Sequence, residues 1–114
     1  MPYIEAKLSV KLDETQKDSL QKKLAGAISS AFSKPSAYIM TNIEDEKSIY
    51  MGGNKAEKGA YVIVRSLGSV SKPACQAATK EICDILTGEF GLNGSNVYVT
   101  YHPVDFWGWN GSMF

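Results

Sequence analysis

Apolar and polar residues alternate over residues 3–10, so the apolar side chains fall on one side of an extended chain and the charged ones on the other. This pattern is typical of a strand with one buried face. Apolar residues then recur at helical spacing over residues 20–32. Asp13 followed by Gln16 forms a capping-box start for this helix, and Pro35 ends it, because the residue before a proline is kept out of the helical conformation.

The second half of the chain repeats this plan. A strand at residues 38–43 completes the first unit, and an apolar run at residues 60–64 predicts the strand that opens the second. Ser71 can cap another amphipathic helix, and residues 96–101 form a fourth strand. The order β-α-β therefore occurs twice.

This repeated order predicts an α+β fold in which a four-stranded sheet carries two helices on one face. A small C-terminal strand follows, and a single domain spans residues 1–114. The other face of the sheet is left uncovered, so part of the apolar run at residues 60–64 would be exposed in a monomer. Residues 106–114 add four large aromatic rings at the end of the chain. We therefore expect self-association, which covers such surfaces.

The charge balance narrows the classes of function. Twelve basic and twelve acidic residues give a formal net charge of zero, so the chain lacks the broad positive field that attracts nucleic acid or an anionic membrane. The strand–helix order is shared with RNA-recognition domains, but residues 58–64 lack the aromatic pair of those domains. No stretch approaches the ~20 apolar residues of a membrane span. Neither nucleic acid nor a membrane is therefore an expected partner.

The two cysteines, Cys75 and Cys83, fall in what reads as one helix. Their spacing separates them by about 12 Å along its axis, which is too far for a disulfide. They form neither a CxxC pair nor a metal-ligand cluster. We interpret them as small core-filling thiols and predict no metal site.

Pro2 is the first candidate for chemistry. A methionine that precedes a small residue is commonly removed, and the product here would carry a free secondary amine at the start of a strand. An ordinary α-amino group titrates near ~7.7–8.0, and burial or a neighbouring lysine lowers that value. A neutral amine can take a proton from a carbon next to a carbonyl. By itself, however, a proline at position 2 is only weak evidence for a catalytic role.

Six segments of the chain support a catalytic interpretation of Pro2. They are PYI at residues 2–4, SKPSAYI at 33–39, MGG at 51–53, SLG at 66–68, NVYV at 96–99 and GWNGSMF at 108–114. In this order and spacing they resemble the macrophage migration inhibitory factor family of the tautomerase superfamily. The resemblance implies a homotrimer of β-α-β repeats that tautomerises phenylpyruvate-type substrates and isomerises dopachrome analogues without a cofactor. The substrate is then a small aromatic α-keto acid.

The resemblance also assigns roles to individual residues. Pro2 corresponds to the catalytic base, and Lys34 to the lysine that holds the substrate carboxylate. Leu67 corresponds to a residue whose backbone N–H binds substrate, and Tyr98 to a pocket tyrosine supplied by the neighbouring subunit. Taken alone, Lys34 is better explained as a cation that stabilises a helix C-terminus.

Aromatic positions complete the implied pocket. The residues that correspond to its walls and rim are Tyr38, Trp109 and Phe114. Taken alone, each of them is better explained by packing in a core or an interface. Thr100 stands where better-known members have a substrate-contacting asparagine, so it keeps a hydroxyl but loses an amide. This exchange predicts an altered substrate preference.

Other positions also depart from the family pattern. Gly59 and Val62 stand where a CxxC motif supports thiol-oxidoreductase activity, so we expect no such activity. His102, the single histidine, reads as a residue of a short loop before Trp109. Trp107 replaces a smaller residue and is expected to narrow the pocket mouth.

An alternative function stays open, because one fold can serve both catalysis and signalling. Relatives act as extracellular proteins that bind a cell-surface receptor, and catalysis can be incidental to that role. The N-terminal residues lack the basic and apolar regions of a signal peptide, which favours a cytoplasmic protein. A signalling role would require secretion by a route independent of a signal peptide.

Overall fold

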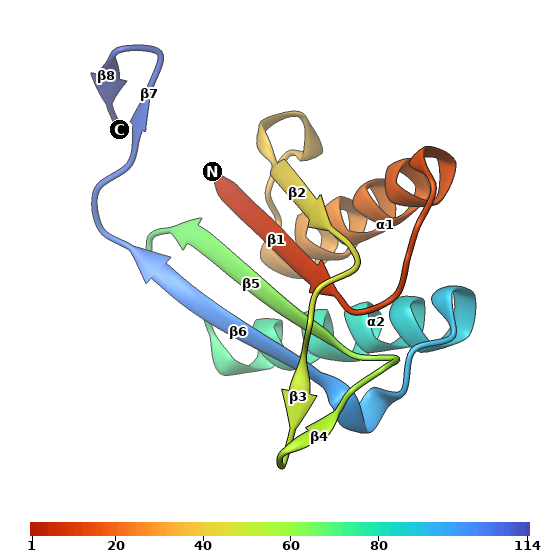
Figure 1. The fold of residues 1–114 in the computed structure, drawn as a ribbon. Helices are drawn as coiled ribbons and strands as arrows, with labels where there is room; N and C mark the ends of the chain where they lie inside the picture. The colour runs from red at the N-terminus through yellow and green to blue at the C-terminus, as the bar shows by residue number, and fades with distance from the viewer.

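The computed structural model describes all 114 residues and contains two consecutive β-α-β units (Figure 1). The first unit consists of β1 (Pro2–Leu8), α1 (Glu14–Phe32), a 3-10 turn η1 (Ser36–Tyr38) and β2 (Met40–Glu44). The second consists of β5 (Ala60–Leu67), α2 (Lys72–Phe90), a 3-10 turn η2 (Gly94–Asn96) and β6 (Val97–Val104). The tandem repeat expected from the sequence is therefore confirmed.

The four long strands form one mixed sheet in the order β2-β1-β5-β6. Within each unit the two strands are parallel, while β1 and β5 meet antiparallel at the centre, with Pro2 opposite Ser66. Both helices lie on the same face of this sheet (Figure 1). The predicted α+β fold class is confirmed. The strand that begins at Pro2 is thus a central strand with a partner on each side.

The core lies between the sheet and the two helices. Alternate residues of β1, beginning with Pro2, are buried, and the residues between them are partly exposed. The fifteen residues of the main hydrophobic cluster come mainly from β1, β5 and the inner faces of the helices. Leu24 of α1 and Ile82 of α2 are fully buried there. The one-sided burial follows from the alternating and helical patterns in the sequence.

Both helices begin at the caps that the sequence predicts. The Asp13 carboxylate accepts a hydrogen bond from the Gln16 backbone N–H at 2.8 Å, and the Gln16 side chain accepts one from the Asp13 backbone N–H at 2.9 Å. Ser71 caps α2 by accepting from the Ala74 N–H at 3.2 Å. Helix α1 ends just before Ser33, which adopts the left-handed conformation with φ 53°. Neither helix is both long and apolar enough to cross a membrane.

Two short hairpins complete the chain. β3 (Tyr50–Met51) pairs with β4 (Asn54–Lys55) across a turn at two glycines with positive φ. β7 (Gly108–Trp109) pairs with β8 (Ser112–Met113) at the C-terminus. The sequence predicted one small C-terminal strand, and the structure has two that pair as a hairpin. It stands away from the helices, on the side where the chain begins (Figure 1).

The structure corrects two details of the sequence analysis. Tyr38 belongs to η1 rather than to a strand, because the Tyr38 N–H bonds to the Pro35 carbonyl at 3.2 Å and closes a tight turn before β2. His102 belongs to β6 rather than to a loop, because β6 stays paired with β5 as far as Val104. Its ring therefore projects from the sheet and not from a connection.

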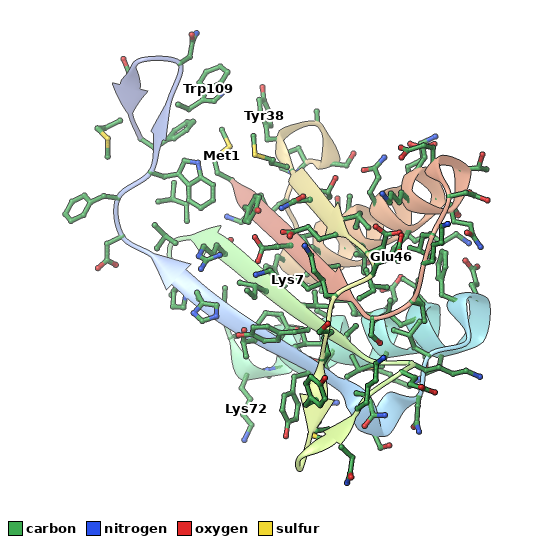
Figure 2. The ribbon with its side chains drawn as sticks, viewed as in Figure 1. Met1, Lys7, Tyr38, Glu46, Lys72 and Trp109 are labelled. Atoms are coloured by element: carbon green, nitrogen blue, oxygen red, sulfur yellow. The ribbon has the colours of Figure 1, made fainter.

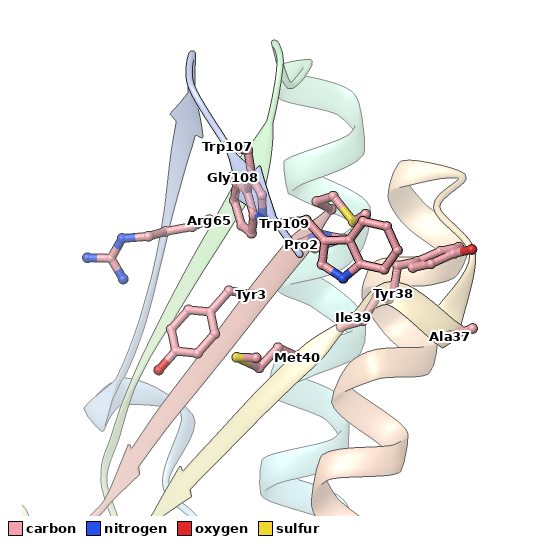
Figure 3. A pocket seen from close by; sticks show the side chains of 11 residues that line it. Pro2, Tyr3, Ala37, Tyr38, Ile39, Met40, Arg65, Trp107, Gly108 and Trp109 are labelled. Atoms are coloured by element: carbon pink, nitrogen blue, oxygen red, sulfur yellow. The ribbon is translucent and has the colours of Figure 1, made fainter. Parts of the chain in front are cut away.

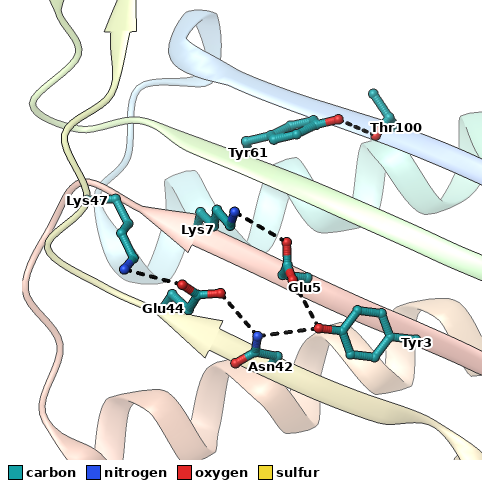
Figure 4. A network of polar contacts seen from close by, with 8 residues as sticks. All are labelled: Tyr3, Glu5, Lys7, Asn42, Glu44, Lys47, Tyr61 and Thr100. Atoms are coloured by element: carbon teal, nitrogen blue, oxygen red, sulfur yellow. Dashed lines mark hydrogen bonds and ion pairs between the residues drawn. The ribbon is translucent and has the colours of Figure 1, made fainter.

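The face of the sheet without helices carries more polar groups than the sequence analysis anticipated. Tyr3 donates to Glu5 at 3.0 Å, and Asn42 donates to Tyr3 at 3.3 Å (Figure 4). Tyr61 and Thr100 share a hydrogen bond of 2.9 Å on the same face. From the apolar run, Ile63 is only 9% exposed. Large exposed apolar side chains instead gather at the sheet edge and in the C-terminal tail.

Candidate active site

Pro2 opens β1 and is fully buried, with its side chain on the helix-covered face of the sheet. A hollow of about 570 Å³ lies at this end of the strand, and most of its walls are apolar (Figure 3). It extends from the chain start to η1 and to the tail. Its lining residues are Met1, Pro2, Tyr3, Ala37, Tyr38, Ile39, Met40, Arg65, Trp107, Gly108 and Trp109.

The terminal amine at this hollow has an altered basicity. Its pKa lies below the ordinary value, first because burial penalises the ammonium form and second because of the positive charge of Lys34. Both causes favour the neutral amine. In this chain the amine still belongs to Met1, which precedes Pro2.

Met1 also accepts a hydrogen bond from a backbone donor of the site. The backbone N–H of Leu67, predicted to bind substrate, donates to the Met1 carbonyl at 3.2 Å. Leu67 ends β5, beside the start of β1, which explains how the two groups meet. Met1 therefore lies in the hollow and blocks the Leu67 N–H.

Lys34 follows the C-terminus of α1, where two hydrogen bonds fix its backbone. Its N–H donates to the Ser29 carbonyl at 3.1 Å, and the Ser29 hydroxyl donates to the Lys34 carbonyl at 2.5 Å. Lys34 takes part in none of the ion pairs of the chain. It does not line the hollow at Pro2 but an adjacent cleft, which also contains Ser66. It acts on the terminal amine through its charge.

Two aromatic side chains at the hollow, Tyr38 and Trp109, come from η1 and from the C-terminal hairpin (Figure 2). Tyr38 and Trp109 meet edge to face with ring centroids 6.3 Å apart. Trp109 and Phe114 stack with centroids 6.0 Å apart. Trp109 is still 54% exposed, so its ring remains open to solvent or to another molecule. Phe114 does not line the hollow itself but stacks on Trp109, which does.

Tyr98 and Thr100 lie far from Pro2 of the same chain. Pro2 pairs with Ser66, whereas Tyr98 pairs with Tyr61 and Thr100 with Ile63, which precede Ser66 in β5 by five and three residues. At about 3.3 Å per residue the separations along the strands are ~16 Å for Tyr98 and ~10 Å for Thr100. Because Val97, Val99 and Tyr101 pack on the core, Tyr98 and Thr100 point to the opposite face of the sheet from Pro2. A single chain does not bring these residues to its own Pro2.

Thr100 has two hydrogen-bond partners on this opposite face. Its hydroxyl lies 2.9 Å from the Tyr61 hydroxyl and 2.9 Å from Nε2 of His102. A hydroxyl has one donor and two acceptor positions, so Thr100 keeps one position free. The His102 ring thus contacts the residue at which this chain departs from the family pattern.

Sequence reasoning missed several residues at the site. Arg65, Met40 and Ile39 line the hollow, and Ser66 lies directly opposite Pro2. Arg65 projects from β5 away from the Trp109 ring (Figure 3). The alternation within the strand at residues 60–67 places Ser66 on the buried face, but only pairing with β1 brings it to Pro2. That pairing has no local signal in the sequence.

The thiols and the CxxC positions lie outside the site. Cys75 and Cys83 are unpaired and partly buried on α2, and burial raises the pKa of both thiols. At Gly59 an added Cβ would lie 2.9 Å from the Asn96 carbonyl oxygen, so the backbone there leaves no room for a side chain. No three His, Cys, Asp or Glu side chains come close enough together to hold a metal ion.

Two β-α-β repeats with a buried proline at the start of a central strand define the tautomerase fold. The family model described as macrophage migration inhibitory factor matches residues 1–114. The chain therefore belongs to the macrophage migration inhibitory factor family.

Individual relatives support this assignment along the whole chain. Macrophage migration inhibitory factor of Xenopus laevis is 30% identical over 116 residues, covering 100% of this chain and 99% of the relative. D-dopachrome decarboxylase of Gallus gallus is 26% identical over 108 residues, covering 94% and 90%. The crystal structure of Leishmania major MIF2 has a TM-score of 0.91 at 30% identity, covering 100% of this chain and 97% of that one.

Proposed function

We propose that this protein is a cofactor-independent keto–enol tautomerase of the phenylpyruvate and dopachrome type, with Pro2 as its base after removal of Met1. The observation that carries the proposal is the terminal amine in a mainly apolar hollow beside an unpaired lysine. Burial and, second, the charge of Lys34 lower the pKa of the Met1 amine, and removal of Met1 would place the Pro2 amine at the same end of β1. A lowered pKa favours the neutral amine, which is the form that takes a proton from carbon.

The mechanism uses groups from β1, η1, β5, β7 and the segment that follows α1. The substrate carboxylate pairs with the ammonium group of Lys34 and accepts from the N–H of Leu67, which the removal of Met1 sets free. The substrate ring packs against the rings of Tyr38 and Trp109, which meet edge to face. In the enol-to-keto direction the Pro2 nitrogen takes the proton of the enol hydroxyl and delivers a proton to the adjacent carbon. The amine is regenerated, so no external oxidant, reductant or metal is needed for balance.

The complete site belongs to a homotrimer in this proposal. Tyr98 and Thr100 of one chain point away from their own Pro2, so a neighbouring chain supplies them across the uncovered face of the sheet. Assembly would also bury the exposed rings at the sheet edge and in the tail at the subunit interface. Light scattering coupled to size-exclusion chromatography tests this, and a monomer at assay concentrations would contradict it.

The decisive test replaces Pro2 with glycine. Intact mass first establishes that Met1 is absent from both the wild type and the Pro2→Gly variant. We expect the variant to keep its fold and its oligomeric state but to lose most phenylpyruvate tautomerase activity, since glycine supplies a primary amine in a more mobile backbone. Unchanged activity in the trimmed variant would exclude Pro2 as the base.

A second candidate function is cytokine-like signalling through a receptor. The Xenopus laevis relative, which covers the whole chain, is named for inhibiting macrophage migration. The Pro2→Gly variant separates the two functions. Receptor binding that survives in the inactive variant would favour signalling, and a substrate that accumulates when the gene is lost would favour the enzyme.

A further inference from the structure

His102, the single histidine of the chain, lies on the uncovered face of the sheet together with Thr100. Nε2 of its ring is 2.9 Å from the Thr100 hydroxyl, two residues earlier on β6. The Tyr61 hydroxyl, on the neighbouring strand β5, is 2.9 Å from the same Thr100 oxygen (Figure 4). The three side chains therefore form a row of hydrogen bonds with Thr100 at its centre.

The number of protons in this row decides what Thr100 can offer to a ligand. A threonine hydroxyl has one proton and two acceptor positions. When Nε2 of His102 carries no proton, Thr100 makes their contact by donating its own proton to the ring. Tyr61 must then donate to Thr100, because the Thr100 proton is already used. One acceptor position of Thr100 is left for a ligand, and no donor.

A proton on Nε2 reverses the bond between the ring and Thr100. The ring then donates, and the Tyr61 hydroxyl can donate to the second acceptor position of Thr100. The Thr100 proton becomes free for a ligand. Histidine is the side chain that ordinarily changes its protonation between about pH 5 and 8. His102 can therefore determine whether Thr100 accepts a hydrogen bond from a ligand or donates one.

No carboxylate competes with Thr100 for the His102 ring. Neither β5 nor β6 contains an acidic residue, and His102 takes part in none of the ion pairs of the chain. Arg65 lies directly opposite His102 on β5, and Asp105 follows β6; neither forms an ion pair. The other titratable and charged side chains of β6, β5 and β1 on this face are Tyr98, Tyr61, Tyr3, Glu5 and Lys7. Glu5 is already engaged, since it accepts from Tyr3 at 3.0 Å and pairs with Lys7 at 3.7 Å.

We propose that His102 is a positioning residue for substrate selection, whose Nε2 takes the Thr100 proton so that Thr100 presents an acceptor to the substrate. The inference rests on the proposed function, in which Thr100 faces the Pro2 pocket of a neighbouring chain. Lys34 and Leu67 hold the substrate carboxylate there, so the group left for Thr100 is a substituent of the ring. Thr100 then favours a substituent that donates a hydrogen bond over one that only accepts, and protonation of His102 relaxes this preference.

The direction of the His102 bond is tested by NMR on the trimmed Pro2→Gly protein, so that catalysis plays no part. Because the chain has one histidine, its ring nitrogen signals need no further residue assignment. In the neutral ring we expect the proton on Nδ1 and none on Nε2. A neutral ring with its proton on Nε2 would overturn the proposal, whatever the outcome for the Pro2 mechanism.

Selection is tested by comparing two ring-substituted phenylpyruvates in the trimmed wild type. The 4-hydroxy compound can donate a hydrogen bond from its substituent, whereas the 4-methoxy compound can only accept one. The ratio of their KM values cancels the titration of groups that act on both substrates alike, including the terminal amine. We expect the methoxy compound to have the higher KM at alkaline pH. Its disadvantage should shrink by about two- to tenfold as His102 is protonated, the size of one neutral hydrogen bond.

Variants separate positioning from a structural role. His102→Gln keeps a polar side chain that does not titrate, so the KM ratio should become independent of pH. Thr100→Val removes the hydroxyl and should abolish the pH dependence although His102 still titrates. The matched control, Thr87→Val, removes an exposed hydroxyl that bonds only to its own helix at 2.8 Å, and should keep the wild-type ratio at every pH. The kcat values should change little, because this bond is made in the ground state and the transition state alike.

The outcomes distinguish this inference from the proposed function. A KM ratio that is independent of pH in the wild type, or equally dependent on pH in His102→Gln, would overturn the role of His102. Both substrates would still turn over in that case, which leaves the Pro2 mechanism standing. A folded, trimmed protein that turns over neither substrate contradicts the proposed function instead, and the NMR measurement still decides the direction of the His102 bond. Thermal unfolding shows whether each variant is folded.

Discussion

Retention of Met1 should inactivate the protein through two separable effects. The perturbation is a preparation from cells in which methionine aminopeptidase is inhibited, compared with trimmed protein of the same sequence. With Met1 present, the Pro2 nitrogen is part of an amide and has no basic lone pair. In addition, the Met1 carbonyl keeps its 3.2 Å hydrogen bond with the Leu67 N–H, so the substrate carboxylate lacks this donor.

The size of each effect follows from the structure. Loss of a positioned general base costs about 10²–10⁴-fold in rate. Loss of a hydrogen bond to a charged group costs about 1.5–3 kcal/mol, or roughly ten- to hundredfold in substrate affinity. The first effect should appear in kcat and the second in KM, because the base acts in the transition state and Leu67 also holds the ground state.

The assay is phenylpyruvate ketonisation followed over a range of substrate concentrations, with intact mass reporting the fraction of trimmed chains. Activity should scale with that fraction across partly trimmed preparations. A preparation that retains Met1 completely and has the kcat of the trimmed enzyme would refute the reasoning. A lowered kcat with an unchanged KM would refute the role of the Leu67 N–H and leave that of Pro2.

Three further predictions follow from the site and the fold. Lys34→Gln removes one of the two causes that lower the pKa of the terminal amine. The amine should then stay protonated up to a higher pH, so the acidic limb of the kcat/KM profile should move to higher pH. A limb that moves to lower pH contradicts the assignment. Leu24→Ala empties a fully buried position in the core and should lower the free energy of unfolding by about 2–5 kcal/mol in urea denaturation. Asp13→Ala removes the carboxylate that accepts the Gln16 backbone N–H in the α1 capping box and should cost about 0.5–2 kcal/mol in the same measurement, whereas Asp13→Asn should cost less.

The parts of the fold that the sequence predicts well are those with local causes. The caps at Asp13 and Ser71 have side-chain partners three residues away, and so the pattern that predicts them is contained in a few residues. The buried faces of the helices follow in the same way from periodicity. Tyr38 and His102 were misplaced because their conformations depend on other elements. Tyr38 closes the turn that leads α1 into β2, and His102 continues a strand only because β5 extends beside it.

The site could be predicted only in part for a similar reason. Family resemblance names Pro2, Lys34 and Leu67 as individual positions, but it does not describe their contacts. The Ser66 hydroxyl has no partner because of the way β1, β5 and the helices enclose it, and this is a property of the tertiary structure. The bond between the Met1 carbonyl and Leu67 likewise joins the start of the chain to a strand that lies far along it.

The sheet order explains how a terminal residue is held in the buried position that the proposed base requires. Chain ends are usually mobile and solvated, and a base there would keep its ordinary pKa and lack a fixed position. Here β1 is paired with β5 from Pro2 onward and with β2 from Tyr3 onward, so the terminus is held inside the sheet rather than at its edge. The same arrangement leaves the β6 residues Tyr98 and Thr100 on the other face, ~16 Å and ~10 Å away along the strands, respectively. A base fixed in this way therefore requires a second chain to complete its pocket, which makes assembly a condition of the proposed catalysis.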